Sequence, residues 1–436
     1  MLPADFIASM QRQYGALAAD LLAAIEKPAI TSFRINPFKS LTVPIFENVT
    51  PVPWCGSAYW LAQRPSFTFD PRFHAGAYYV QEASSMFLET IWKNFIPDEP
   101  LRVLDACAAP GGKSTHLLSL LNGKGLLVSN EMVPGRNSIL RQNIARWGMS
   151  NVVVTQNEIQ AFESLPEAFD VVVVDAPCSG EGLFRKDHEA RGEWTIRHVA
   201  ACAIRQEKIV ASLREMVAPG GFLIYSTCTF EDAENDAIVS SLTPEFECLQ
   251  LADVPESVTC TKYGYAFLPH LVPSEGFYIS CWKKKGERTS PTAGAPVKMQ
   301  SLPAAANLCE KRVLGFEQAG RWHIFPETQM RFLRQLQEHL YVRAAGIVAG
   351  EMKGNDFIPD QELALAAHVN THHEAVAVDY NGAIAFLQGQ PLPPSGRTGW
   401  KKVCFEGNAL GWIKEVNGRT NNYYPKGWRI QQSQIR

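Results

Sequence analysis

The sequence predicts an α/β protein with a parallel sheet, a small α+β region at the N-terminus and a β-rich region at the C-terminus. Residues 101–236 alternate apolar, β-branched runs with helical patterns, as do strands joined by crossover helices. The first of these runs passes into a glycine-rich turn at residues 106–113, which is typical of a strand leading into a ligand-binding helix. Beyond residue 300 the periodicity changes to short strand-like runs separated by turns.

Composition limits the possible classes of protein. The chain has 436 residues, from which we expect two or three domains. Its hydrophobic content of 46% and charged content of 19% predict a large core and exclude a disordered protein. The net charge of −3 gives no overall attraction to nucleic acid, but from Arg397 onward eight basic residues face two acidic ones. This asymmetry indicates a C-terminal end that binds a polyanion.

The N-terminal unit is expected at residues 1–95. Apolar residues within positions 1–30 recur near helical spacing and predict short helices. Residues 31–37 read as a strand that ends at Pro37. Residues 40–80 are rich in aromatic side chains and prolines, and we expect them to form a compact, irregular cover.

The central unit is expected at residues 96–285. Strands are predicted at 102–105, 125–130, 152–155, 171–175, 221–226 and 277–282, with helices at 114–121 and 136–147. A polar segment with proline and glycine, residues 286–300, is predicted to be a linker. The C-terminal unit then covers 301–436, with short strands near 403–405 and 411–414.

The cysteine pattern and the lack of long apolar runs indicate the cellular compartment in which the protein is expected. Ten cysteines are scattered without a CxxC pair, which argues against a zinc site or a disulfide framework, so no metal is expected. The N-terminus does not read as a secretory signal. No apolar run reaches the roughly 18 residues that a membrane span needs. We therefore expect a cytoplasmic, monomeric protein without a membrane partner.

The glycine-rich turn is the candidate cofactor loop. Asp105 ends the strand and Gly111-Gly112 forms the turn, where backbone N–H groups can face a ligand that glycine lets approach closely. Glu131 follows Gly112 by 19 residues, close to the spacing of about 20 expected for an acid that holds ribose hydroxyls.

Two alternatives to a cofactor loop remain open. Residues 107–114 match the P-loop pattern GxxxxGK[ST] except at the first position, where Cys107 replaces glycine. Pro110 also stiffens the loop. A nucleoside triphosphate site and a purely structural turn are therefore weaker alternatives.

Two cysteines stand where strands end, beside this loop. Cys178 follows Asp175-Ala176-Pro177, and Cys228 lies in Ser226-Thr227-Cys228-Thr229. Cysteine is usually a small buried apolar residue, and we accept that interpretation for Cys202, Cys248, Cys260, Cys281, Cys309 and Cys404. Cys178 and Cys228 instead belong to loops at the same sheet edge as the cofactor turn. Because an ionised thiol is a strong nucleophile, this placement predicts covalent chemistry on a bound ligand.

These segments resemble the motifs of a known family, the RNA cytosine-C5 methyltransferases of the NOL1/NOP2/sun family. The motifs are Ala108-Ala109-Pro110-Gly111-Gly112-Lys113, Asp175-Ala176-Pro177-Cys178-Ser179-Gly180 and Ser226-Thr227-Cys228-Thr229. Accessory matches are Arg34-Ile35-Asn36, Gln81-Glu82-Ala83-Ser84-Ser85-Met86, Pro269-His270 and Glu275-Gly276-Phe277. The stretch Asn421-Asn422-Tyr423-Tyr424-Pro425-Lys426-Gly427 resembles the PUA-like tail of the bacterial ribosomal-RNA branch, the RsmF-like enzymes.

The resemblance implies a Rossmann-like methyltransferase sheet with a PUA-like C-terminal domain, and S-adenosylmethionine as cofactor. The residues it implies for cofactor binding are Cys107, Ala108, Ala109, Pro110, Gly111, Gly112, Lys113, Glu131, Arg136, Glu158 and Asp175. Glu158 stands where the family usually has Asp. Lys113 either adds positive charge near the site or is a solvated lysine at a helix start.

The resemblance also implies the chemistry. Cys228 would attack carbon 6 of a cytosine, Asp175 would hydrogen-bond ring N3, and Cys178 would assist release of the enzyme. RNA, most of all ribosomal RNA of the small subunit, would be the partner. Arg185, Lys186 and Lys426 would contact it, and the weaker alternative for Arg185 and Lys186 is a surface pair. The alternatives are a transfer-RNA substrate and a non-catalytic RNA-binding factor that assists ribosome assembly.

Overall fold

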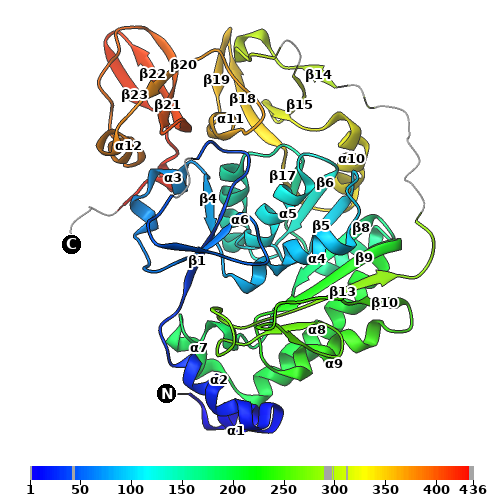
Figure 1. Ribbon diagram of the computed structural model, residues 1–436. Coiled ribbons are helices and arrows are strands. Elements are labelled where there is room, and N and C mark those ends of the chain that lie inside the picture. The colour runs from blue at the N-terminus through cyan, green and yellow to red at the C-terminus, as the bar shows by residue number, and fades with distance from the viewer. Residues whose placement is uncertain (1, 42–44, 289–296, 298, 311–312, 432–436) are drawn as a thin grey trace.

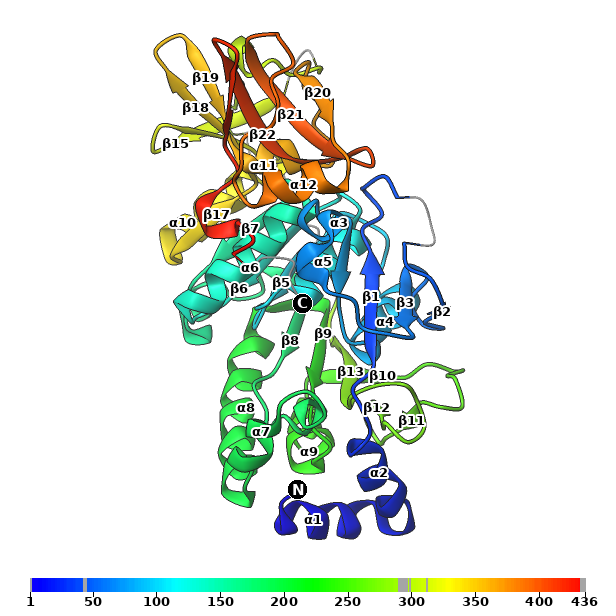
Figure 2. The ribbon, with the colours of Figure 1, turned by 90° about the vertical axis from the view of Figure 1, so that its left-hand side faces the viewer.

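The computed structural model describes residues 2–41, 45–288, 297, 299–310 and 313–431. The molecule is elongated (Figures 1 and 2): the first two helices lie at one end, the C-terminal sheets lie at the other, and a large sheet occupies the middle. Most of the expected linker 286–300, namely residues 289–296 and 298, lies outside the described residues.

The central sheet has ten strands among the described residues, in the order β11-β12-β13-β9-β8-β5-β6-β7-β17, with β10 paired to β13. The run from β9 to β7 is parallel, and β13 and β17 close it antiparallel at its two sides. The strands are β5 (Arg102–Asp105), β6 (Leu126–Asn130), β7 (Val152–Thr155), β8 (Phe169–Asp175), β9 (Val217–Thr227), β10 (Phe246–Leu249), β11 (Thr259–Cys260), β12 (Tyr265–Phe267), β13 (Phe277–Lys284) and β17 (Val342–Ala345). The predicted parallel sheet is confirmed.

Both faces of this sheet are covered, because successive side chains of a strand point to opposite faces. Val171 and Val173 of β8 pack with the helices on one face, and Val172 and Val174 pack with those on the other. The first face is covered by α4 (Leu88–Phe95), α5 (Gly112–Leu121) and α6 (Pro134–Trp147). The second is covered by α8 (Ile196–Met216), α9 (Asp236–Val239) and α10 (Met330–His339). A further short helix, α7 (His188–Glu193), precedes α8.

The N-terminal region forms two expected helices and one unexpected sheet. Its elements are α1 (Ala4–Tyr14), α2 (Ala18–Ile25), β1 (Thr31–Ile35), β2 (Val49–Pro51), β3 (Ala58–Leu61), α3 (Pro71–His74) and β4 (Tyr78–Val80). The strands make an antiparallel sheet in the order β2-β3-β1-β4. The prediction of an irregular cover is therefore wrong in part. The prolines and aromatic residues surround three short strands that pair with one another or with β1.

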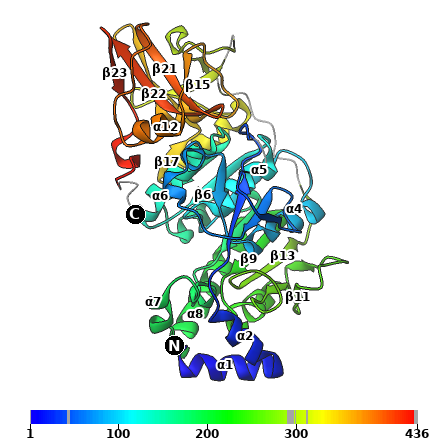
Figure 3. The same cartoon turned by 60° about the vertical axis from the view of Figure 1, so that its left-hand side comes forward.

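The C-terminal region holds two further sheets, as Figure 3 also shows. One has the order β14-β15-β16-β18-β19 and the other β20-β21-β22-β23. The elements are β14 (Gln300–Ser301), β15 (Leu314–Gln318), β16 (Arg321–Ile324), β18 (Ile347–Lys353), β19 (Asp356–Pro359), α11 (Gln361–Leu365), β20 (Glu374–Ala377), α12 (Tyr380–Leu387), β21 (Gly399–Phe405), β22 (Asn408–Val416) and β23 (Arg419–Asn422). The predicted short strands near 403–405 and 411–414 lie in β21 and β22.

One segment departs from the expected division at residue 301. β17 pairs antiparallel with β7 of the central sheet, and the fully buried Leu333 and Leu336 of α10 belong to the same core as β8. Residues 330–345 therefore share a core with the central sheet, although the sequence predicts them in the C-terminal unit.

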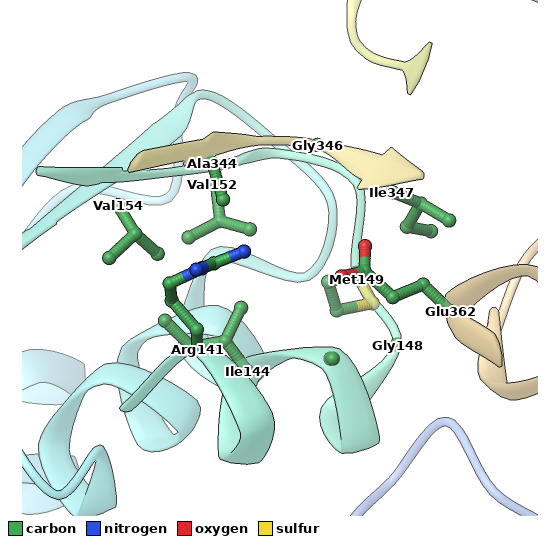
Figure 4. A pocket seen from close by; sticks show the side chains of 11 residues that line it. Arg141, Ile144, Gly148, Met149, Val152, Val154, Ala344, Gly346, Ile347 and Glu362 are labelled. Atoms are coloured by element: carbon green, nitrogen blue, oxygen red, sulfur yellow. The ribbon is translucent and has the colours of Figure 1, made fainter. Parts of the chain in front are cut away.

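A cavity of 20 Å³ marks the junction between the central and C-terminal parts (Figure 4). Arg141 points into it from α6, while Glu362 approaches it from α11. Such a volume holds about one water molecule, so it is too small for a cofactor. Among the described residues, no helix has the length and apolar character to cross a membrane.

Candidate active site

The cofactor turn lies between β5 and α5. Gly111 caps the helix with φ of 111°, a conformation that side chains with a Cβ rarely adopt. Asp105 at the end of β5 is fully buried and accepts a hydrogen bond from Ser114 Oγ at 2.6 Å. Burial raises the pKa of Asp105 to about 7. The hydrogen bond between Ser114 and Asp105 therefore holds the turn on its buried side, and the other side of the turn faces a pocket.

A cavity of 710 Å³ opens beside this turn, at the carboxyl ends of the parallel strands. Eight of the predicted site residues line it: Cys107, Ala109, Glu131, Arg136, Glu158, Asp175, Cys178 and Cys228. Ligands bind at this edge of open α/β sheets, so the structure brings these residues together where a ligand is expected.

Glu131 and its neighbours shape the far wall of this cavity. Glu131 Oε1 accepts a hydrogen bond from the Val133 N–H at 2.9 Å, while Oε2 faces Arg136 at 3.6 Å. Arg136 also donates to the carbonyl of Ala109 at 2.9 Å and so ties α6 to the glycine turn. Glu158 is exposed at the rim. One Glu131 oxygen is therefore held loosely enough to accept hydrogen bonds from a ligand.

The two cysteines meet at the floor of the cavity. Cys178 follows β8 and Cys228 follows β9, and the two Sγ atoms lie 3.3 Å apart. The contact with the Cys228 thiol, followed by burial, raises the pKa of Cys178 well above its usual range. Position 182 next to Cys228 accepts only glycine, because a Cβ there would lie 2.9 Å from the Cys228 carbonyl oxygen.

A second cavity, of 330 Å³, adjoins the first. Cys107, Ala109, Asp175, Leu183 and Cys228 line both cavities. The predicted residues Ala108, Pro110, Gly112, Lys113 and Lys186 line the second one alone. Asp175 and Cys228 therefore stand at the boundary between the two cavities.

Lys113 is buried rather than solvated. Its Nζ lies 2.9 Å from Asp175 Oδ2 and 4.9 Å from the centre of the Phe277 ring. The other carboxylate oxygen of Asp175 accepts from Ser226 Oγ at 2.9 Å. These contacts orient Asp175 at the cavity boundary, so the alternative of a solvated lysine at the helix start does not hold.

Arg185 has a different position from the one expected. Its side chain is 4% exposed, donates to the Ser274 carbonyl at 2.8 Å and lies 3.7 Å from Glu275. The contact with RNA predicted for Arg185 is therefore not supported, because its guanidinium is used within the fold. Lys186 lies at the wall of the smaller cavity, and Lys426 is exposed in the C-terminal region.

Part of the C-terminal positive charge is also used internally. Lys401 is buried and forms ion pairs with Glu415 at 2.9 Å and Glu374 at 3.6 Å. Trp412 and Tyr424 are core residues, whereas Tyr423 is 44% exposed. The surface that could meet a polyanion is accordingly smaller than the sequence suggests.

Several lining residues were not identified as site residues from the sequence. Asn130 and Asn157 line the larger cavity, and Tyr79 and Phe277 line the smaller one. Asn130 ends β6 directly before Glu131, and this position at a strand end could have identified it as a residue that lines the cavity. Tyr79 arrives from the N-terminal sheet through long-range pairing, for which the sequence carries no local signal.

A buried cluster of Cys55, Glu89 and His116 has the chemistry of metal ligands, with its ligand atoms within 4.8 Å of one another. Glu89 already accepts from Cys55 Sγ at 3.0 Å, lies 3.2 Å from His116 Nε2, and pairs with Lys93 at 2.6 Å. Hydrogen bonds therefore account for the cluster, and it lines neither of the two cavities described above.

Three protein-family models match the chain. Residues 94–283 match the model described as 16S rRNA methyltransferase RsmB/F. Residues 2–83 match the N-terminal domain of 16S rRNA methyltransferase RsmF, and residues 373–430 match the methyltransferase RsmF PUA domain.

Known relatives match most of the chain, and solved structures match about two thirds of it. The ribosomal RNA small subunit methyltransferase F of Aeromonas salmonicida is 31% identical over 93% of this chain and 92% of its own. That of Klebsiella pneumoniae is 30% identical over 97% and 96%. A methyltransferase homologue from Pyrococcus horikoshii, a solved structure, matches with a TM-score of 0.56 and 26% identity over 64% of this chain and 94% of its own. The NSun6 structure from the same organism, solved with SFG, matches in fold with a TM-score of 0.58 and 18% identity over 65% and 99%.

Proposed function

This chain belongs to the RsmF branch of the 16S rRNA methyltransferases, and on that premise we propose that it methylates carbon 5 of a cytosine in small-subunit ribosomal RNA. It is an S-adenosylmethionine-dependent RNA methyltransferase. The observation that carries the finer proposal is the 3.3 Å contact between the Cys178 and Cys228 thiols where the two cavities meet.

The larger cavity fits the cofactor. Its 710 Å³ lies within the range of cofactor sites, and Glu131 offers a carboxylate oxygen for ribose hydroxyls. Arg136, Glu158, Cys107 and Ala109, which line the same cavity, would complete the binding set. When bound, S-adenosylmethionine supplies an electrophilic methyl group.

The smaller cavity fits a single base. A base must leave its stack to enter such a site, at a cost of a few kcal/mol in a duplex and less in a loop. Asp175 would hydrogen-bond ring N3 of the cytosine, held in place by Lys113 and Ser226. Because Asp175 lines both cavities, the base and the cofactor would meet beside it.

The two thiols would have different roles in the covalent reaction. Cytosine carbon 5 is a poor nucleophile until the Cys228 thiolate bonds to carbon 6, which turns the ring into an enamine. Carbon 5 would then bond to the methyl group as the methyl–sulfur bond breaks, and would afterwards give up its proton to water. The electrons of that C–H bond restore the ring double bond, and the carbon–sulfur bond breaks to return the Cys228 thiolate. The raised pKa of Cys178 favours Cys178 as the thiol that stays protonated.

The C-terminal region would hold the RNA. Exposed Lys426 and Arg419 and the exposed Tyr423 ring can contact phosphates and stack on bases. A ribosomal RNA substrate would place the enzyme in the bacterial cytoplasm.

Bisulfite sequencing of total RNA tests this proposal. Cells that lack the gene should lose one or more 5-methylcytosines in 16S rRNA, and expression of the intact enzyme should restore them. Loss of a site in transfer RNA alone would make transfer RNA the substrate. An unchanged pattern in every RNA would favour a non-catalytic assembly factor.

A further inference from the structure

Two buried carboxyl groups lie directly beneath the cysteine loops. Glu181, in the 3₁₀ helix Glu181–Leu183, is 1% exposed, and Glu234, in the 3₁₀ helix Asp232–Glu234, is fully buried. Ser179 Oγ lies between them, 2.7 Å from Glu181 Oε1 and in short contact with Glu234 Oε1. Among the ion pairs of the described residues, none involves either acid.

This geometry requires a shared proton. A serine hydroxyl has a single hydrogen and can donate to only one carboxylate. The other close contact needs a protonated carboxyl that donates to Ser179 Oγ. Two buried carboxylates so close together would also repel each other strongly if both were ionised. One of the two acids therefore keeps a proton in the arrangement described.

The contacts around the pair assign the shared proton to Glu234. Its Oε2 accepts from the Ser179 N–H at 3.0 Å and from Gln206 Nε2 at 2.7 Å, and its Oε1 lies 3.4 Å from Thr229 Oγ1. Glu181 Oε1, which faces Ser179 Oγ, also accepts from Trp194 Nε1, and Glu181 Oε2 is buried without a hydrogen-bond partner. Glu234 is therefore the acid that donates to Ser179 Oγ through its Oε1, and Glu181 is the carboxylate that accepts from Ser179.

Glu234 also joins the two cysteine loops. Ser179 directly follows Cys178, and Thr229 directly follows Cys228. Gln206 donates both to Glu234 and to the Pro177 carbonyl, at 2.9 Å, just before Cys178. The carboxyl group of Glu234 therefore links the two loops that set the distance between the Cys178 and Cys228 thiols.

We propose that Glu234 and Glu181 form a proton-sharing pair that positions the Cys178 and Cys228 thiols and gives the reaction an alkaline limit. The roles of the thiols in this inference rest on the proposed function. When the shared proton leaves at high pH, a second negative charge arises beneath the thiols. That charge disfavours the attacking thiolate, and the hydrogen bond from Glu234 to Ser179 breaks.

Other ionisable groups face this pair. They are Tyr14 of α1, Cys178 of the loop after β8, Cys202 of α8, Tyr225 of β9, and Glu231. Burial raises the pKa of Glu234 to about 7 and also raises that of Glu181, which agrees with a proton that Glu234 keeps at acidic pH and loses as the pH rises through neutrality.

Three glutamine variants test the pair. Glu234→Gln supplies an amide N–H to Ser179 at every pH, with its amide oxygen toward the Ser179 N–H and Gln206, and so mimics the protonated acid. Glu181→Gln removes the carboxylate that accepts from Ser179 and Trp194. Glu231→Gln is the matched control, because Glu231 lies in the loop just before Glu234 and accepts from Ser9 of α1 at 3.0 Å.

Two quantities are measured for the wild type and each variant from about pH 5.5 to about 9.5. One is kcat for methyl transfer. The other is the rate at which iodoacetamide alkylates Cys178 and Cys228, resolved by peptide mass mapping. Glu181→Gln should lower kcat about 10- to 100-fold with little change in KM. Glu234→Gln should lose the alkaline fall in kcat, and its Cys228 alkylation should rise further with pH than in the wild type.

Thiol alkylation does not depend on methyl transfer, so it separates this inference from the proposed function. If the wild type methylates no cytosine but Glu234→Gln still changes the alkylation profile, the proton-sharing pair is supported and the proposed function is wrong. Identical pH profiles for Glu234→Gln and the wild type would overturn the pair, as would an equal shift from Glu231→Gln. If Glu181→Gln does not fold, Ser179→Ala replaces it. In that background Glu234→Gln should no longer move the profile, and a persisting shift would also overturn the pair.

Discussion

The helix α10 should stabilise the catalytic part of the molecule although it follows the linker in sequence. Leu333 of α10 is fully buried against the central sheet. Directly after this helix, the Tyr341 carbonyl accepts from the Gln156 N–H at 3.0 Å, and the Tyr341 N–H donates to Asn157 Oδ1 at 3.0 Å. Asn157 lines the larger cavity. The substitution Leu333→Ala therefore disturbs a support of the proposed cofactor site.

The size of the effect follows from burial. Leu→Ala removes about three carbon groups worth about 0.8 kcal/mol each, or about 2.4 kcal/mol of transfer free energy. The cavity that remains brings the expected loss to about 3 kcal/mol, within the range of about 2–5 kcal/mol for such sites. In a unit of this size the melting temperature should fall by roughly 6–12 °C.

Thermal and denaturant unfolding of the full chain, with and without S-adenosylmethionine, measure this loss. Arg334→Ala is the matched control, because Arg334 is exposed on the same helix. Removal of all residues beyond 300 should also abolish cofactor binding. A loss below about 1 kcal/mol for Leu333→Ala, or a chain ending at residue 300 that binds cofactor normally, would refute the shared core.

Three further predictions concern the site and the RNA. Glu131→Ala should weaken S-adenosylmethionine binding by about 1–3 kcal/mol in calorimetry, because charge-assisted hydrogen bonds to the ligand are removed. Lys113→Met should lower kcat about 10- to 100-fold, since Asp175 loses its buried partner, while cofactor affinity measured by calorimetry stays within about threefold. Replacing both Arg419 and Lys426 by Ala should weaken RNA binding and reduce its salt slope by roughly 0.7–0.9 for each phosphate that the protein no longer neutralises, as titrations at several salt concentrations would show.

Each of these predictions has a control and a contrary result. Glu207→Ala, on the exposed side of α8, should leave cofactor affinity unchanged, and an unchanged affinity for Glu131→Ala would remove Glu131 from the ribose site. A Lys113→Met enzyme with normal kcat would show that Asp175 needs no cation. Lys208→Ala changes an exposed charge on α8, and an equal loss of RNA affinity there would mean that the C-terminal charges have no special role.

The central strands could be predicted well because their signal is local. Residues 102–105 and 152–155 match β5 and β7 in full, since short β-branched runs bounded by turns leave few alternatives. The meeting of Cys178 with Cys228 was also foreseeable, because the carboxyl ends of neighbouring parallel strands share one edge.

Features that the sequence did not predict depend on long-range pairing. β17 pairs with β7, which lies nearly 190 residues earlier in the chain. The short sequence Val342–Ala345 is compatible with a strand but does not indicate which strand it pairs with. Arg185 turned inward because it pairs with Glu275, which precedes β13, and Lys401 because it pairs with Glu415 on the neighbouring strand. The net charge of a segment cannot distinguish such internal pairs from an exposed surface.

Mapping a trapped adduct tests the proposed covalent chemistry at its decisive step. Cys178→Ala enzyme, incubated with 16S rRNA and S-adenosylmethionine, should accumulate a covalent protein–RNA complex, because attack proceeds and release is impaired. Digestion with nuclease and protease, followed by mass spectrometry, should find a methylated cytidine on the peptide that contains Cys228. Cys228→Ala should form no adduct. A stable adduct in the Cys228→Ala enzyme, or a modified cysteine other than Cys228, would contradict the proposed roles of the two thiols.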